Sequence, residues 1–154
     1  MKMKRLYVAY GSNLNLEQMS YRCPTAKVYG KGMLYGYRLL FKGVPGNAYL
    51  TIEPCKGKRV PALIWEVQSK DELALDRYEG YPSFYYKEDI PVELETGEIV
   101  TAMVYIMTNK IKDRIHLNSP SQSYLRTVKE GYKSAGFDLS FIDEAIEIST
   151  KREK

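Results

Sequence analysis

Residues 99–107 constrain the fold most, because they form a segment that is apolar on both faces of a predicted β-strand. Alternate side chains of a strand point to opposite faces of its sheet. Both sets are apolar here: Val100, Ala102, Val104 and Ile106 on one face, and Met103, Tyr105 and Met107 on the other. Such a strand belongs in the middle of a sheet that is covered on both sides. We therefore expect a sheet with this segment at its centre.

Further strands are predicted by short apolar runs that are bounded by glycine, proline and polar turns. These strands cover residues 5–10, 25–41, 48–52, 60–67 and 85–94. Glycines interrupt the second of them, as in bent or bulged strands: Gly30, Gly32 and Gly36. Polar turns at residues 45–47, 56–58 and 96–98 are expected to join neighbouring strands.

Helix-start patterns predict helices in four places. The first is a short helix that is capped by Asn13 and ends at residue 21, and the second covers residues 70–78 with Ser69 and Glu72 as a capping box. The third is opened by residues 119–121 and closed by Gly136, and the last is capped by Ser140. The last two are amphipathic and would cover the sheet. With 154 residues, one core suffices, so we expect a single α+β domain over residues 1–154.

Composition excludes several classes of function. Hydrophobic residues make up 44% and charged residues 27%, as in an ordinary globular protein. The net charge is +4, but the basic residues are scattered or gathered at the ends, in 1–5 and 151–154, without interleaved aromatic residues, so nucleic-acid binding is not expected. No apolar run is long enough to span a bilayer and no signal peptide is evident, which favours the cytoplasm and reduced Cys23 and Cys55.

The chain offers little for binding a metal ion, since His116 is its single histidine and no cysteine pair has zinc spacing. Tyrosine, by contrast, is abundant, with 14 residues against 4 Phe and 1 Trp. Phenol rings combine apolar surface with a hydroxyl that needs a partner. They suit the wall of a pocket, although the same aromatic surface could serve a homodimer interface.

The first candidate site segment is residues 7–14, in which a predicted strand runs into a turn at Gly11 and then a helix. Backbone N–H groups at such a turn are free to bind an anion. Ser12 is a poor nucleophile candidate, because Tyr10 stands where the G-x-S-x-G pattern needs its first glycine. Ser12 and Asn13 therefore either bind an anion or simply cap the helix.

The second segment is residues 76–80, where a helix gives way to a turn and the sequence presents Glu79. Burial beside aromatic side chains would raise the pKa of this carboxyl toward neutrality, as a proton shuttle requires. The neighbouring aromatics are Tyr78, Tyr81, Phe84, Tyr85 and Tyr86. The alternative is a structural glutamate that pairs with Arg77 or a lysine.

Four short motifs follow one another along the chain: A-Y-G-S-N-L at 9–14, D-R-Y-E-G at 76–80, Y-I-M-T-N at 105–109 and S-P-S-Q-S-Y at 119–124. With these motifs in this order, the chain resembles the gamma-glutamylcyclotransferase family from about residue 6 to about residue 148. The resemblance implies a small mixed β-barrel flanked by helices. It also implies release of 5-oxoproline from a gamma-glutamyl compound, with neither metal nor organic cofactor.

The resemblance also assigns roles to residues. Glu79 would take a proton from the substrate α-ammonium group and later return one to the departing amine, whose identity stays open. The glutamyl group would be held by Tyr7, Val8, Ala9, Tyr10, Gly11, Ser12 and Asn13, and the pocket would be closed by Tyr124. Tyr85 matches the family's loop tyrosine, with Tyr86 as the alternative alignment. The rival hypothesis is a non-catalytic protein that binds a small carboxylate on the same fold.

Overall fold

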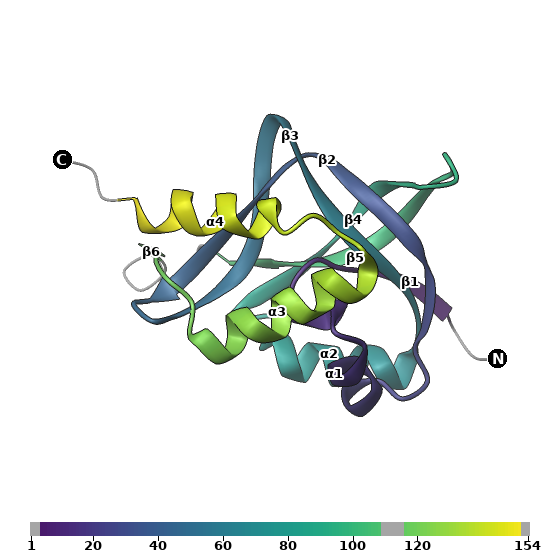
Figure 1. Ribbon diagram of the computed structural model, residues 1–154. Helices are drawn as coiled ribbons and strands as arrows, with labels where there is room; N and C mark the ends of the chain where they lie inside the picture. Colours follow the sequence, from purple (N-terminus) through teal and green to yellow (C-terminus); the bar gives the residue numbers. More distant parts are fainter. Residues whose placement is uncertain (1–3, 109–115, 152–154) are drawn as a thin grey trace.

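The computed structural model describes residues 4–108 and 116–151 (Figure 1). Its strands are β1 (Lys4–Ala9), β2 (Lys27–Val44), β3 (Asn47–Gln68), β4 (Tyr85–Leu94), β5 (Ile99–Met107) and β6 (His116–Leu117). Their order is β3-β1-β5-β4-β2-β6, and β2 also pairs with β3, so that β1 to β5 close into a barrel. Only the β1–β5 pairing within the described part of the chain is parallel. The predicted small mixed β-barrel is confirmed.

Strand β5 lies between β1 and β4, as its two apolar faces predict. All of residues 102–107 are buried, whereas Ile99, at the start of the strand, is exposed. Side chains on both faces of β5 are therefore buried over this part of the strand. The strand therefore forms part of the wall on which the rest of the core packs.

The long strand β3 corrects one prediction, since residues 48–52 and 60–67 belong to one continuous strand rather than two. Strand β2 pairs with β3 on both sides of the polar segment 56–58. The pairing register shifts between Tyr35 and Tyr37, opposite this segment, and Gly57 adopts a positive φ of 85°. Because the partner strand continues, the polar segment forms a bulge and not a chain reversal.

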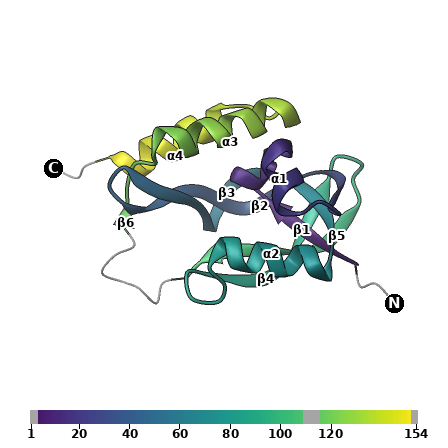
Figure 2. The same ribbon diagram turned by 90° about the horizontal axis from the view of Figure 1, so that it is seen from below.

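The helices are α1 (Leu16–Arg22), α2 (Ser69–Glu79), α3 (Gln122–Ala135) and α4 (Ser140–Thr150), with a 3-10 turn, η1 (Ser12–Leu14), before α1. Figure 2 shows α3 and α4 together along one side of the barrel and α2 on the other side. Ser121 caps α3 and Gly136 ends it, as predicted. Asn109 and the terminal basic residues Lys2, Arg152 and Lys154 lie outside the described residues.

Three predicted caps are wrong by one or two residues. Asn15, not Asn13, caps α1 by accepting a hydrogen bond from the backbone of Gln18. The capping box of α2 consists of Gln68 and Asp71 instead of Ser69 and Glu72, and α4 begins after Leu139 with no side-chain cap from Ser140. The first of these shifts matters for function, because it leaves Asn13 in a separate turn. Among the described residues, no helix is long and apolar enough to cross a membrane.

Candidate active site

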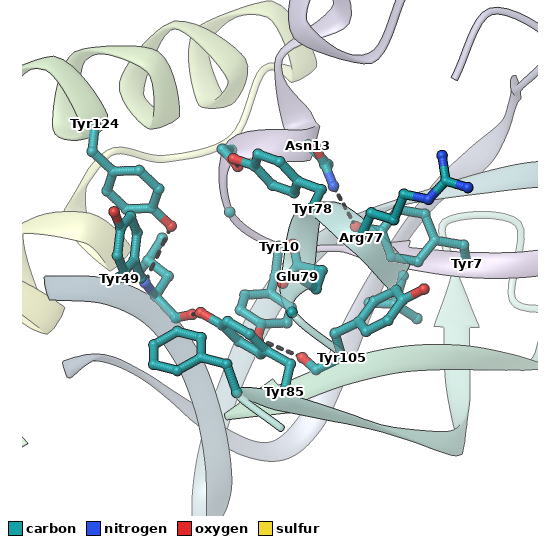
Figure 3. Close-up of a pocket in the computed structure, with 16 residues that line it drawn as sticks. Tyr7, Tyr10, Asn13, Tyr49, Arg77, Tyr78, Glu79, Tyr85, Tyr105 and Tyr124 are labelled. Carbon is teal, nitrogen blue, oxygen red and sulfur yellow. Dashed lines mark hydrogen bonds between the residues drawn. The ribbon is translucent and has the colours of Figure 1, made fainter. Parts of the chain in front are cut away.

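A pocket of about 410 Å³ opens where β1 ends, beside the carboxyl end of α2 (Figure 3). It takes side chains from the barrel strands, from η1, from α2 and from the start of α3. Its lining residues are Tyr7, Val8, Tyr10, Gly11, Ser12, Asn13, Tyr49, Leu50, Arg77, Tyr78, Glu79, Gly80, Phe84, Tyr85, Tyr105 and Tyr124. The cavity has the size of an ordinary small-molecule site.

Glu79 lies in the middle of the pocket, on the last residue of α2 (Figure 3). Gly80 ends the helix with a φ of 66°, a left-handed conformation that favours glycine. Burial raises the pKa of the Glu79 carboxyl from its ordinary value of 4.5 to about 7, and the charge of Arg22 opposes this shift only partly. A carboxyl with this pKa can both accept and donate a proton near neutral pH.

The carboxyl of Glu79 has no hydrogen bond or ion pair within residues 4–108 and 116–151. The ion pair between Glu79 and Arg77, which the sequence left open as a structural role for Glu79, is therefore absent from the described residues. Side chains two positions apart on a helix do not face each other, and Figure 3 shows the guanidinium of Arg77 directed away from Glu79. Glu79 thus remains available to a ligand.

Three of the tyrosines in the pocket have their hydroxyls hydrogen-bonded to the protein backbone. Tyr10 donates to the carbonyl of Tyr105 at 2.7 Å and Tyr85 donates to the carbonyl of Leu50 at 2.8 Å. The hydroxyl of Tyr124 accepts a hydrogen bond from the backbone N–H of Leu50 at 3.1 Å. Burial raises the pKa of Tyr10, Tyr85 and Tyr124 above the ordinary value, so these phenols stay neutral. They surround Glu79 without supplying a charge to it.

The turn after β1 forms the opposite wall of the pocket. The carbonyls of Gly11 and Ser12 accept hydrogen bonds from Leu14 and Asn15, whereas no hydrogen bond from the N–H groups of Gly11, Ser12 or Asn13 is found in the described part of the protein. A Cβ on Gly11 would lie 3.4 Å from the hydroxyl of Tyr124. The backbone is therefore open to the cavity at this point, as an anion-binding turn requires.

Side chains hold this turn in place. Asn13 donates to the hydroxyl of Tyr7 at 2.8 Å, accepts from Arg22, and its carbonyl accepts from Trp65 at 3.1 Å. The hydroxyls of Ser12 and Tyr78 are 2.8 Å apart. The side chain of Asn13 is thus engaged with the protein, and that of Ser12 is hydrogen-bonded to a pocket wall.

The structure brings most of the predicted site residues together around one cavity. Tyr7, Val8, Tyr10, Gly11, Ser12, Asn13, Glu79, Tyr85 and Tyr124 all line the pocket. Ala9 is buried but is not among the lining residues. Tyr85 lines the pocket with 6% of its surface exposed, whereas Tyr86 is outside it and 41% exposed. Tyr81, expected to shelter Glu79, is also outside the lining and 40% exposed.

Sequence reasoning missed part of the pocket wall. Tyr49 and Leu50 come from β3. Tyr105 comes from β5, and the sequence had identified it as a core residue and as part of the motif at 105–109, but not as a site residue. Arg77 had been considered only as a partner of Glu79. The aromatic character of Tyr49 and Tyr105 is visible in the sequence, but no local pattern shows that the barrel brings them to the same cavity.

Comparisons with known proteins agree with this fold and identify the family. Residues 7–126 match the family model "Gamma-glutamyl cyclotransferase, AIG2-like". Gamma-glutamylcyclotransferases of Bos taurus and Homo sapiens are 29% and 28% identical over 144 residues, which cover 88% of this chain and 74% of each relative. A solved structure of a gamma-glutamyl cyclotransferase superposes with a TM-score of 0.80 and 26% identity, covering 99% of this chain and 92% of that one.

These relatives are enzymes, and the similarity spans both site segments. The rival hypothesis of a non-catalytic carboxylate-binding protein is therefore wrong. The chain belongs to the gamma-glutamyl cyclotransferase, AIG2-like family of enzymes.

Proposed function

We propose that this enzyme releases 5-oxoproline from a gamma-glutamyl compound and that Glu79 transfers the protons. The observation that carries the proposal is the state of Glu79: its pKa is raised to about 7, it has no partner in the described part of the chain, and it faces an open cavity. The named cyclotransferase relatives support the same reaction class.

The reaction needs one proton acceptor that later becomes a donor. The Glu79 carboxylate takes a proton from the α-ammonium group of the substrate, and the freed amine attacks the γ-carbonyl carbon to form the new C–N bond. The tetrahedral intermediate then expels the original amine as the old C–N bond breaks, and Glu79 gives its proton to the departing nitrogen. The ring nitrogen, which still carries one proton more than the lactam has, releases that proton to the departing amine or to the solvent. The products are 5-oxoproline and the free amine, and Glu79 returns to its starting state.

This mechanism requires no nucleophile from the enzyme. Ser12, the one hydroxyl at the turn, is hydrogen-bonded to Tyr78, and no histidine lines the pocket. Because the attacking amine and the carbonyl belong to one molecule, the enzyme contributes mainly by holding the folded conformer. Well-oriented intramolecular reactions reach effective molarities of roughly 10⁵ M or more.

The N–H groups of Gly11, Ser12 and Asn13 would bind negative charge, either the glutamyl carboxylate or the developing oxyanion. Tyr124 lies beside this turn, since a Cβ on Gly11 would come 3.4 Å from its hydroxyl. Its ring contacts that of Tyr49 edge to face, with centroids 5.0 Å apart. Tyr124 would therefore close the pocket over the glutamyl group.

The test is release of 5-oxoproline from gamma-glutamyl amino acids, gamma-glutamyl amines and gamma-glutamyl-lysine isomers. Glu79→Gln keeps the size of the side chain and removes its acid–base function, so we expect a loss of turnover of at least about 10²-fold. Glu147→Gln is the matched control, because Glu147 is exposed on α4 and outside the pocket. Retention of full activity by Glu79→Gln would show that the assigned proton transfer is wrong.

A further inference from the structure

Arg77 is the only cationic residue among those that line the pocket. It is exposed, and no hydrogen bond or ion pair of its side chain is found in residues 4–108 and 116–151. The other charged residue of the lining is Glu79, whose pKa is affected by Arg22 but not detectably by Arg77. The pocket mouth therefore carries a positive charge that no described group neutralises.

The neighbouring cations are engaged elsewhere. The guanidinium of Arg22 stacks on the ring of Tyr78 at 3.5 Å and donates to Asn13 and Gln18. The ammonium group of Lys87 binds Glu72 at 2.6 Å and Asp76 at 3.0 Å. These contacts fix Arg22 and Lys87 as parts of the protein framework, which distinguishes them from Arg77.

The position of Arg77 relative to Glu79 indicates which part of a substrate it can reach. Glu79 must lie next to the scissile amide, because it donates a proton to the departing nitrogen. In the proposed function the glutamyl part is bound at the turn at Gly11, and in that binding mode the departing part extends toward the solvent. Arg77 is two residues before Glu79 on α2, it is exposed, and its side chain is directed away from Glu79 (Figure 3).

A planar guanidinium is well suited to a carboxylate, because it can form two parallel hydrogen bonds with it. The amides at the turn can satisfy one negative group of the glutamyl part, but a gamma-glutamyl amino acid carries a second carboxylate on its leaving group. An uncharged gamma-glutamyl amine lacks this carboxylate. The two kinds of substrate thus differ at the place where Arg77 supplies its charge.

We propose that Arg77 determines leaving-group specificity: its guanidinium binds a carboxylate next to the departing nitrogen, so that the enzyme prefers gamma-glutamyl amino acids to uncharged gamma-glutamyl amines. This inference rests on the proposed function, because it assumes a cyclotransferase reaction at Glu79. It adds the chemical class of the leaving group and the residue that selects it.

The test uses two substrates that differ only in this carboxylate, gamma-glutamyl-alanine and gamma-glutamyl-ethylamine. For the wild-type enzyme, kcat/KM should be about tenfold or more higher for the alanine compound, as expected for hydrogen bonds to a charged group. Arg77→Gln should lower this ratio about tenfold, chiefly by raising the KM of the alanine compound, while kcat/KM for the ethylamine compound should change much less. Arg77→Lys should keep part of the preference.

The control is Arg59→Gln, which removes an exposed arginine of β3 that lies outside the pocket. If Arg77→Gln leaves the ratio of the two kcat/KM values unchanged, the inference is overturned. An equal loss of kcat/KM for both substrates would also overturn it, because Arg77 would then contact the glutamyl part that they share. Both of these outcomes leave the cyclotransferase reaction intact. Failure of the wild-type enzyme to release 5-oxoproline from either substrate would overturn the proposed function together with the inference.

Discussion

The raised pKa of Glu79 predicts that this residue destabilises the folded protein above neutral pH. In the unfolded chain the carboxyl titrates near its ordinary pKa of 4.5, and in the folded chain burial raises this to about 7. Between these pH values the folded state binds more protons than the unfolded state, so the free energy of unfolding falls as the pH rises. At about 1.4 kcal/mol for each pH unit, the total loss is about 3 kcal/mol.

Glu79→Gln removes this titration while keeping the shape of the side chain. Below about pH 4.5, where the carboxyl is protonated in both states, we expect the variant and the wild type to have similar stability. Their difference should grow as the pH rises, until above about pH 7 the variant is more stable by about 3 kcal/mol. The measurement is urea-induced unfolding of both proteins at several pH values from 4 to 8.5.

Subtracting the wild type from the variant cancels the other titrating groups, which the two proteins share. Glu147→Gln should show no such pH-dependent gain, because Glu147 is an exposed residue of α4. A flat difference across the whole range would refute the reasoning about burial. A variant that is less stable than the wild type at pH 8 would show that the protein stabilises the ionised carboxylate.

Four further predictions concern catalysis and packing. In the proposed mechanism the ionised form of Glu79 starts the reaction, so kcat/KM should rise with pH through about 7 and be about tenfold lower at pH 6 than at its plateau. A rise centred near 4.5 would contradict this. Tyr124→Phe removes the acceptor of the Leu50 N–H and should lower kcat/KM, whereas unchanged kinetics would reduce Tyr124 to a packing residue. The buried hydroxyl of Tyr132 has no hydrogen-bond partner among the described residues. Tyr132→Phe should therefore leave the melting temperature unchanged or raise it, with a gain in the free energy of unfolding of at most about 1 kcal/mol. Tyr85→Phe should instead destabilise the protein by about 1–3 kcal/mol, because it leaves the buried carbonyl of Leu50 without its phenol donor.

Local patterns were sufficient to predict β5, because its position in the barrel depends only on having two apolar faces. They failed for β3, where the polar segment 56–58 looks like a turn. Whether such a segment reverses the chain or bulges depends on the partner strand, and β2 continues alongside it. Pairing between distant residues decided this case, and no short window of sequence contains that information.

The capping errors have a different origin. Each predicted cap stands near another polar residue that can do the same work, such as Asn15 two positions after Asn13 and Gln68 directly before Ser69. Propensity ranks these candidates almost equally, and tertiary contacts choose between them. Asn13 is held by Tyr7, Arg22 and Trp65, so the helix begins later and the turn at Gly11 stays separate from it.

Glu79 and Arg77 show how closely the candidate site depends on three-dimensional geometry. Their proximity in sequence makes an ion pair reasonable, and the sequence alone leaves that pairing and a proton shuttle as alternatives. The helix separates them, because residues two positions apart project in different directions. Burial then raises the pKa of Glu79 inside the pocket, while Arg77 is exposed and directed away from it. Had the two paired, the arginine would favour the ionised carboxylate and lower its pKa, which would make Glu79 a poor proton donor to a departing amine. Their separation is therefore a condition of both proposals, proton transfer by Glu79 and recognition of the leaving group by Arg77.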